Sequence, residues 1–462
     1  MPLFDRQKRD AVDQLVEDFT QHRLGRRSFL ERSLALGFSA SAASALLAAC
    51  GESHPSPPPA PGTVDLLTVW GSAEPDSFSF RAVIDPFSTK TGITVTIEGN
   101  RDLNAVLTTR IQGGNPPDMA ILSNPGKMQE LARQHHLIKL DSFLDMTKMK
   151  ADYAQSWIDL GSYHGGFYAL FYKAANKGTV WYNPAQFKAD NLQIPATWDD
   201  LIKLSDQLAG AGKYPWSMGV ESGAATGWAA TDWVAEIYLN ESGPEMYDKW
   251  VTHKIPWTDP SIKSAFQKFG KIAGGTHYIH GAPQSIVATN FQAATYPPFT
   301  SPPQAYMNYL GDFAAGFIEA QFPNAKPGTD FDFFPFPTIN SHYQGAITGG
   351  ADVVVALKDT PTVRQLVTYL ATAEAQTIWV KRGGFTSPNK SIPLSEYPDA
   401  VAQASAKMLT SASSFRFGAG DLMPSALQTA WWKAMTTFIQ DQTQLGSILS
   451  SLESTAQQAS TS

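Results

Sequence analysis

Between residues 64 and 122 the chain alternates between short apolar strands and helical stretches, and this order constrains its fold more than any other feature. Strands are expected at 64–71, 93–98 and 118–122, and helices at 76–92 and 103–111. This alternation is typical of a parallel sheet covered by helices, in which ligands bind at the carboxyl ends of the strands. We therefore expect a site among the loops that begin at Trp70, Gly99 and Ser123.

Composition sets wider bounds on the fold and the function. The chain has 462 residues, of which 43% are apolar, enough for two or three domains with large cores. Its 35 Lys and Arg against 42 Asp and Glu argue against a nucleic-acid partner. A single cysteine, Cys50, excludes a disulfide framework and a cysteine-based zinc site. The 12 Trp and 15 Tyr either fill a core or offer flat faces to ligands, and composition does not choose between the two.

The first fifty residues are interpreted as an export signal. The apolar run at 34–49 is shorter than the roughly twenty residues that a bilayer span needs. It follows Arg26 and Arg27, in a phrase that resembles the twin-arginine signals of bacteria, and it ends at Cys50 in a phrase that resembles a lipobox. The alternative is a basic pair before a buried helix and a chance thiol. Residues 51–63 are rich in proline and are expected to form an extended tether behind a lipidated Cys50.

Many phrases of the remaining chain resemble the sugar-binding extracellular solute-binding proteins of bacterial ABC importers. Single phrases, such as Thr-Val-Trp-Gly at 68–71 and Gly-Asn-Pro-Pro-Asp at 114–118, are common, but their order and spacing are specific. The other phrases lie at 87–95, 177–184, 195–201, 221–228, 349–358, 372–376 and 382–389. Together they span nearly all of residues 64–430, and they look most similar to the branch that binds α-glucosides and related oligosaccharides.

The resemblance implies a two-lobed α/β fold of the type II periplasmic binding proteins. Each lobe would be a mostly parallel sheet flanked by helices, with the ligand in the cleft between the lobes. It further implies a monomeric carrier with no enzymatic activity and no cofactor, whose partners are a saccharide, the permease of an ABC importer and, through Cys50, membrane lipid. The protein would be exported and anchored at the outer face of the cytoplasmic membrane or held in the periplasm.

The expected segments follow the discontinuous lobes of that family. They are 1–49 for the export signal, 50–63 for the lipidated cysteine and tether, 64–170 and 337–388 for lobe one, and 171–336 and 389–462 for lobe two. The run at 167–174 is apolar and aromatic on alternate sides and is predicted to cross between the lobes, with a return near 330–337. Helices are expected at 362–383 in lobe one and at 397–409 and 425–440 in lobe two.

Sugars present hydroxyl groups in the ring plane and C–H patches above and below it. Carboxylates, amides and arginine bind the hydroxyls, and aromatic rings stack on the C–H faces. The predicted ligand-binding residues are Trp70, Ser72, Glu74, Asp118, Ser123, Asn124, Trp228, Asp232, Trp233, Asp312, Gly349, Gly350, Asp352 and Arg382. The glycine pair is included because it would allow a ligand to approach the backbone closely.

Each assignment has a structural alternative. The tryptophans could pack in the core, Asp118 could cap a neighbouring loop, Gly349 could make a turn, and Arg382 could cap the preceding helix. Trp431 and Trp432 are left unassigned, since one of them is expected to pack and the other to line the cleft.

Enzyme signatures are absent from the sequence. No His-Glu-x-x-His, Gly-x-Ser-x-Gly or phosphate-loop pattern occurs, and the pairs His135/His136 and His277/His280 have no neighbouring cysteine, so neither a metal site nor a catalytic residue is assigned. Two alternatives stay open. One is a glycoside hydrolase, which would place two carboxyl groups about 5 to 10 Å apart. The other is a carrier for a different solute, such as iron or a polyamine, although the many tryptophans favour a neutral sugar.

Overall fold

A computed structural model describes residues 62–275, 277–281 and 284–461. The predicted export signal with Arg26 and Arg27, the lipidation at Cys50 and most of the tether lie outside these residues. Among the described helices, none combines the length and the apolar character that a membrane crossing requires.

The first half of the larger sheet is the parallel unit expected from the strand and helix alternation. Strand β1 (Thr63–Thr68) pairs in parallel with β2 (Thr94–Gly99) on one side and with β3 (Met119–Leu122) on the other. The helices between them are α4 (Pro75–Thr91) and α5 (Leu103–Gln112). Helix α4 begins with proline and ends at Gly92, whose positive φ of 73° and N–H bond to Ser88 are typical of a helix C-terminus. These five elements are confirmed to within a few residues.

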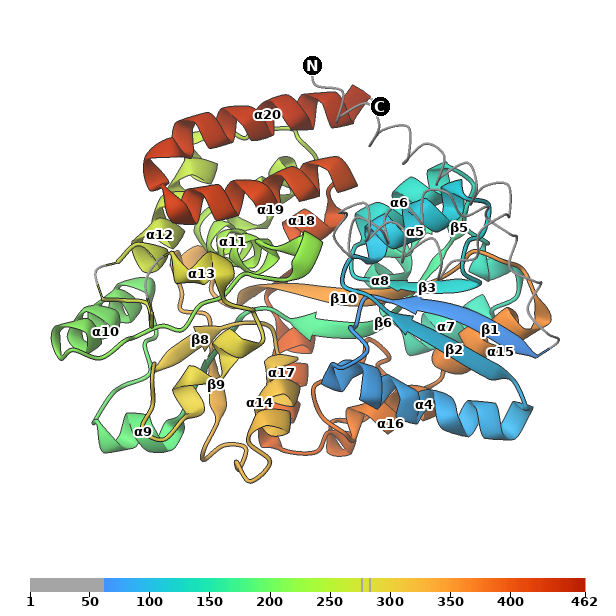
Figure 1. Ribbon diagram of the computed structural model, residues 1–462, viewed down its shortest axis with the longest axis horizontal. Coiled ribbons are helices and arrows are strands. Elements are labelled where there is room, and N and C mark those ends of the chain that lie inside the picture. Colours follow the sequence, from blue (N-terminus) through green and yellow to red (C-terminus); the bar gives the residue numbers. More distant parts are fainter. Residues whose placement is uncertain (1–61, 276, 282–283, 462) are drawn as a thin grey trace, which may run out of the picture. The chain divides into compact units, whose positions relative to one another are not determined.

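The larger sheet is completed by long-range pairings. Strand β10 (Ala346–Ala356) runs antiparallel to β3 and to β6 (Ala169–Asn176), and parallel to β11 (Ser414–Phe417). Figure 1 shows β6 and β10 extending together from this sheet toward the second lobe. Helices α15 (Pro361–Leu370) and α16 (Ala373–Val380) follow β10, and α16 packs against α4. The sheet is therefore mixed.

The second lobe has a small sheet of its own. Its strands β8 (Met307–Tyr309), β7 (Thr179–Tyr182) and β9 (Asp332–Pro335) pair antiparallel in that order, where a mostly parallel sheet was expected. Strand β9 occupies the segment that was predicted to return to lobe one. The return is instead made by β10, which begins beside helix α11 (Trp228–Val251) and ends beside β3. A strand-like sequence predicts a strand, but it does not identify the neighbour with which the strand pairs.

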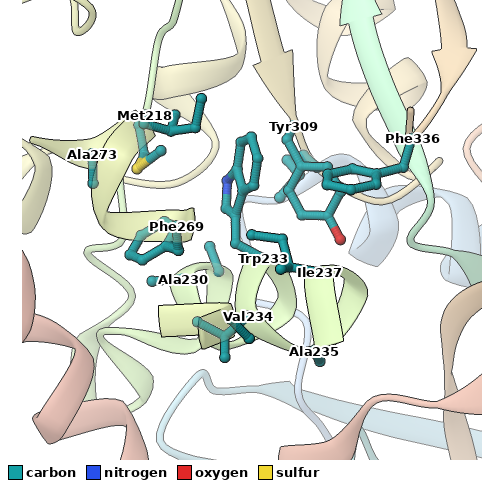
Figure 2. Close-up of a cluster of buried hydrophobic side chains, with 14 of the residues drawn as sticks. Met218, Ala230, Trp233, Val234, Ala235, Ile237, Phe269, Ala273, Tyr309 and Phe336 are labelled. Carbon is teal, nitrogen blue, oxygen red and sulfur yellow. The ribbon is translucent and has the colours of Figure 1, made fainter. Parts of the chain in front are cut away.

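The small sheet and the helices of this lobe share a hydrophobic core that is rich in aromatic residues. Helix α11 packs against α12 (Pro260–Ala273) and α19 (Ser425–Gln440), and α19 lies beside α20 (Leu445–Thr461). In Figure 2 the indole of Trp233, from α11, lies between Phe269 on one side and Tyr309 with Phe336 on the other. Besides short 3-10 turns, the other α-helices and strands of the described residues are α6 (Pro125–Arg133), α7 (Met146–Asp152), α8 (Gln155–Leu160), β4 (Ser162–Tyr163), β5 (Gly166–Phe167), α9 (Pro184–Ala189), α10 (Trp198–Gly210), α13 (Ser285–Ala288), α14 (Ala314–Gln321), α17 (Ala400–Ser411) and α18 (Ala419–Leu422).

Candidate functional site

A cavity of about 610 Å³ lies where the crossing strands meet the two lobes. This volume is within the roughly 300 to 1,000 Å³ that is typical of small-ligand pockets. Its charged lining residues are Asp76, Arg101, Asp102, Lys127, Lys173, Lys177, Asp232, Asp352 and Asp421. Its aromatic lining residues are Trp70, Trp228, Phe291, Phe313, Phe317 and Trp432. The lining therefore combines the two groups that saccharides require, hydrogen-bonding carboxylates and flat apolar faces.

One charged cluster lies on the crossing strands. Lys173 of β6 and Asp352 of β10 are cross-strand neighbours. The Lys173 ammonium lies 2.9 Å from a carboxylate oxygen of Asp76, and the indole N–H of Trp70 donates to Asp352 at 2.8 Å. Burial raises the pKa of Asp352 to about 6, although the charge of Lys173 and the bond from Trp70 oppose this shift. Asp352 is therefore a carboxyl group whose ionisation changes near neutral pH.

A second charged cluster lies at the end of β6. The Lys177 ammonium is 2.9 Å from Asp232 on α11 and 3.2 Å from Asp421 on α18. Burial lowers the pKa of Lys177, but the two carboxylates outweigh this and raise it above its ordinary value. Burial also raises the pKa of Asp232, with Lys177 opposing and Asp421 adding to the rise. Lys127, the third buried lysine of the cavity lining, pairs with Glu130 at 2.8 Å, so all three are already paired with carboxylates of the protein.

An aromatic wall faces these clusters. Trp228 is half-buried, packs edge to face on Phe291 with the ring centroids 5.1 Å apart, and lies 6.2 Å from Phe313. The Lys177 ammonium lies 5.8 Å from the centroid of the Trp228 ring. Trp228 begins α11 directly after Gly227, where an added Cβ would lie only 2.2 Å from the backbone oxygen of Trp432. This close approach brings the two tryptophans to the same cavity.

The bacterial extracellular solute-binding protein family matches residues 72–377 of the chain. The chain belongs to this family. It is 37% identical over 355 residues to the osmoprotective compounds-binding protein GgtB of Synechocystis sp., covering 77% of this chain and 83% of that protein. It is 33% identical over 387 residues to the alpha-glucosides-binding periplasmic protein AglE of Rhizobium meliloti, covering 81% of this chain and 83% of that protein.

Solved structures confirm the fold of this solute-binding protein. The bacterial solute receptor AcbH superposes with a TM-score of 0.76 at 20% identity, over 86% of this chain and 99% of that one. A chitin oligosaccharide binding protein superposes with a TM-score of 0.75 at 17% identity, over 87% and 99%. The two-lobed α/β fold that the sequence resemblance implied is therefore confirmed.

Six of the residues predicted to bind ligand in this solute-binding protein line the cavity. They are Trp70, Ser123, Trp228, Asp232, Gly350 and Asp352. Their contacts with a ligand stay predictions. Trp70 is only 2% exposed and packs against Phe80 and Trp379, so its ring belongs to the core while its N–H holds Asp352 at the cavity.

Three predicted residues instead support loops near the cavity. Glu74 forms an ion pair with Arg101, which does line the cavity. Ser72 is exposed and donates from its hydroxyl to the backbone oxygen of Gly99 at 3.4 Å. Asn124 is buried and donates to Gln428 at 2.7 Å. None of the three is among the lining residues, because each side chain is directed to a protein partner.

Two predicted carboxylates are used structurally elsewhere. Asp118 precedes β3 and so lies at the amino end of a parallel strand, opposite the end where ligands bind. It pairs with Lys358 at 2.9 Å and accepts the N–H of Asp65 at 2.8 Å, which is the loop-capping alternative. Asp312 is buried and accepts hydroxyl bonds from Thr386 and Ser405.

The other three predicted residues also lie outside the cavity lining. Trp233 is 2% exposed and forms part of the core of lobe two. Gly349 faces the ring of Phe415, where an added Cβ would lie 2.3 Å from a ring carbon. The guanidinium of Arg382 lies on the exposed side, 3.5 Å from the hydroxyl of Ser79. Helical spacing placed Asp232 on the face of Trp228, whereas Trp233 lies five residues along the helix, and the rings of the two tryptophans have different surroundings.

Sequence reasoning missed several lining residues, above all Lys173, Lys177 and Asp76. A signal for Lys173 exists, because it interrupts an otherwise apolar strand and a buried cation is costly unless it is paired. Of the unassigned tryptophan pair, Trp432 lines the cavity and Trp431 is fully buried. Within the described ranges, no group of three or more His, Cys, Asp or Glu side chains is arranged to hold a metal ion.

Proposed function

We propose that the protein captures a neutral saccharide in the cavity, an α-glucoside or another oligosaccharide, and delivers it unchanged to the permease of an ABC importer. The observation that carries this proposal is the lining itself, which combines the indole rings of Trp228 and Trp432 with the carboxylates of Asp232 and Asp352. Of the two relatives described above, one is named for binding osmoprotective compounds and the other for binding alpha-glucosides.

The charges of the cavity support a neutral ligand. The cations of the lining all have carboxylate partners in the protein: Lys173 and Lys177 pair with Asp76, Asp232 and Asp421, Arg101 with Glu74, and Lys127 with Glu130. These cations are therefore engaged by the protein and offer little to a phosphate or carboxylate group of a ligand. Carboxylates that accept hydrogen bonds are well suited to hydroxyl groups.

The test is a thermal-shift screen of maltose, trehalose, sucrose and raffinose, with amino acids, polyamines and iron as controls. A ligand that binds only the folded state raises the melting temperature in proportion to the logarithm of its concentration above Kd. We expect a saccharide to give the largest shift and to be recovered intact by chromatography. Hydrolysis beyond one equivalent in a pure preparation would favour the glycoside hydrolase, and a shift with the control solutes alone would contradict sugar binding.

We further propose that Cys50 is lipidated and that the proline-rich tether holds the binding lobes at the outer face of the membrane. The family is extracellular, which supports export of this chain. Cys50→Ser is expected to move the protein from the membrane fraction to the soluble exported fraction, because the lipid would be its anchor. Fractionation followed by immunoblotting measures the change. Continued membrane association of the variant would show that another segment holds it.

We also propose that the arginine pair Arg26 and Arg27, which precedes Cys50, directs export through the twin-arginine route. Replacing both Arg26 and Arg27 by lysine is expected to leave the protein in the cytoplasm, whereas the same double change at Arg6 and Arg9, outside the arginine pair, serves as the control and should be exported normally. Normal export of the double variant would assign the signal to the general secretory route.

A further inference from the structure

The ammonium group of Lys177 joins three segments that are far apart in the sequence. Lys177 directly follows β6, Asp232 lies on α11 and Asp421 lies on α18. Helices α11 and α18 pack against each other beside α19 (Figure 1). One side chain therefore links a crossing strand to two helices that carry residues of the cavity lining.

Two glycines leave space for this side chain. A Cβ at Gly350 would lie 2.9 Å from Cε of Lys177, and a Cβ at Gly418 would lie 3.3 Å from its Nζ. Gly350 was expected to admit the ligand to the backbone, but the stem of Lys177 occupies much of that space. The lack of a side chain at Gly350 and Gly418 thus serves the path of Lys177 to its two carboxylates.

The carboxylates of Asp232 and Asp421 differ in whether their second oxygen already accepts a hydrogen bond from the protein. Asp421 also accepts a bond from the Gln428 amide through its other oxygen, at 3.1 Å. Asp232 bonds Lys177 through Oδ1, and among the described residues its Oδ2 has no hydrogen-bond donor. Asp232 lines the cavity, beside the ring of Trp228 one helical turn earlier. Its second oxygen is therefore placed to accept a hydroxyl group from a ligand.

We propose that Lys177 is a positioning residue, which holds the carboxylate of Asp232 in place and ionised so that Oδ2 accepts a saccharide hydroxyl. This proposal rests on the proposed function of the cavity. It adds that Lys177 orients the carboxylate of Asp232 for a hydrogen bond with the ligand. Lys177 itself is occupied by its two carboxylates, so it acts through Asp232 and does not contact the ligand.

The charged groups around Asp232 determine how its pKa would change if Lys177 were removed. Asp421 on α18 and Glu236 on α11 are the neighbouring acidic groups, and the phenols of Tyr309 on β8 and Tyr247 on α11 face the same region. Lys177 is the cation that lowers the pKa of Asp232 against burial and Asp421. Without it, the remaining influences raise that pKa, and Asp232 takes up a proton at a higher pH.

The experiment compares wild type with Lys177→Met. The Kd of the strongest saccharide in the screen is measured by calorimetry from about pH 5 to about pH 9, and the ionisation of Asp232 in the ligand-free protein is followed by NMR of labelled carboxyl carbons. We expect affinity to fall at least about tenfold at pH 7 and to recover toward pH 9. A tenfold loss at pH 7 requires Asp232 to be about nine-tenths protonated there, so the midpoints of both the affinity profile and the carboxyl titration should move upward by about two pH units.

Two further variants separate positioning from a general structural effect. Lys268→Met removes a cation that pairs with Glu241 at 2.8 Å outside the cavity, and it should change neither midpoint. Lys177→Met combined with Asp421→Asn removes the like charge as well, and it should move both midpoints back toward wild type. This double variant also tests the proposal if the single variant fails to fold.

The outcomes that overturn the proposal are distinct from a failure of the proposed function. An equal loss of affinity at every pH, or an unmoved Asp232 titration, would show that Lys177 serves only the fold. Unchanged affinity in Lys177→Met would show that Asp232 needs no such partner. A wild-type protein that binds no saccharide would contradict the function, while the carboxyl titration would still decide whether Lys177 keeps Asp232 ionised.

Discussion

Trp228→Ala is expected to weaken saccharide binding about tenfold or more while lowering the melting temperature of the ligand-free protein much less than truncation of a core tryptophan would. The ring is half-buried and lines the cavity, so its loss removes apolar contact with the ligand. Contact of this kind is worth about 1.5 to 3 kcal/mol for a large side chain, and about 1.4 kcal/mol corresponds to a tenfold change in Kd. Calorimetric titration and thermal denaturation of the same preparation measure the two quantities.

Trp233→Ala is the matched control, because it removes the same side chain five residues further along the same helix. Trp233 is 2% exposed and packs against Phe269, Tyr309 and Phe336 (Figure 2). Its truncation is expected to cost about 3 to 5 kcal/mol of the free energy of unfolding, with little change in the Kd of the protein that remains folded. The reverse pattern in the two variants would remove Trp228 from the site and leave the ligand contact to Trp432.

Saccharide affinity is expected to fall as the pH is lowered through about 6. The pKa of Asp352 is raised from 3.8 to about 6, first by burial, against the opposing effects of Lys173 and the Trp70 N–H. Above this value Asp352 is a carboxylate, which accepts hydroxyl bonds more strongly than the neutral acid does. Protonation therefore weakens the contact, and Kd measured across this range should rise on the acid side.

The stability of the ligand-free protein should change in the opposite direction over the same range. Because the pKa of Asp352 is higher in the folded state than in the unfolded chain, folding takes up a proton between the two values. Its contribution to the free energy of unfolding is fully present below the unfolded pKa and is lost as the pH rises through about 6. The melting temperature without sugar should thus decrease where the affinity for sugar increases.

Asp352→Asn isolates this group from the other carboxyls of the cavity. The amide oxygen can still accept the Trp70 N–H, so the fold near β10 should be retained. We expect about tenfold weaker binding at neutral pH and a smaller dependence of both Kd and melting temperature on pH, since a buried bond to a charged acceptor has been lost. A pH profile identical to that of wild type would assign the dependence to another group, with Asp232 the first to test.

The secondary structure of lobe one was predictable because its signals are local. Apolar runs of strand length, the proline at the start of α4 and the glycine at its end all lie within the segments that they define. The crossing strand β6 was found in the same way, but its partner was not. Strand β9 and strand β10 both read as strands, and only pairing with β7 or with β6 and β3 separates them.

The family, the order of the elements in the first lobe and six of the residues that line the cavity could be inferred from sequence patterns alone. Long-range packing was needed to learn that Trp432 and not Trp431 lines the cavity, and that the stem of Lys177 fills the space beside Gly350. It also places Asp118 at the amino end of its strand, away from the cavity. The reason is that these outcomes depend on partners distant in sequence. Trp70 and Asp352 are 282 residues apart, and Lys177 and Asp421 are 244 apart. Local patterns fix whether a segment is a helix or a strand, but the surroundings of a side chain are set by whichever segments the fold brings against it.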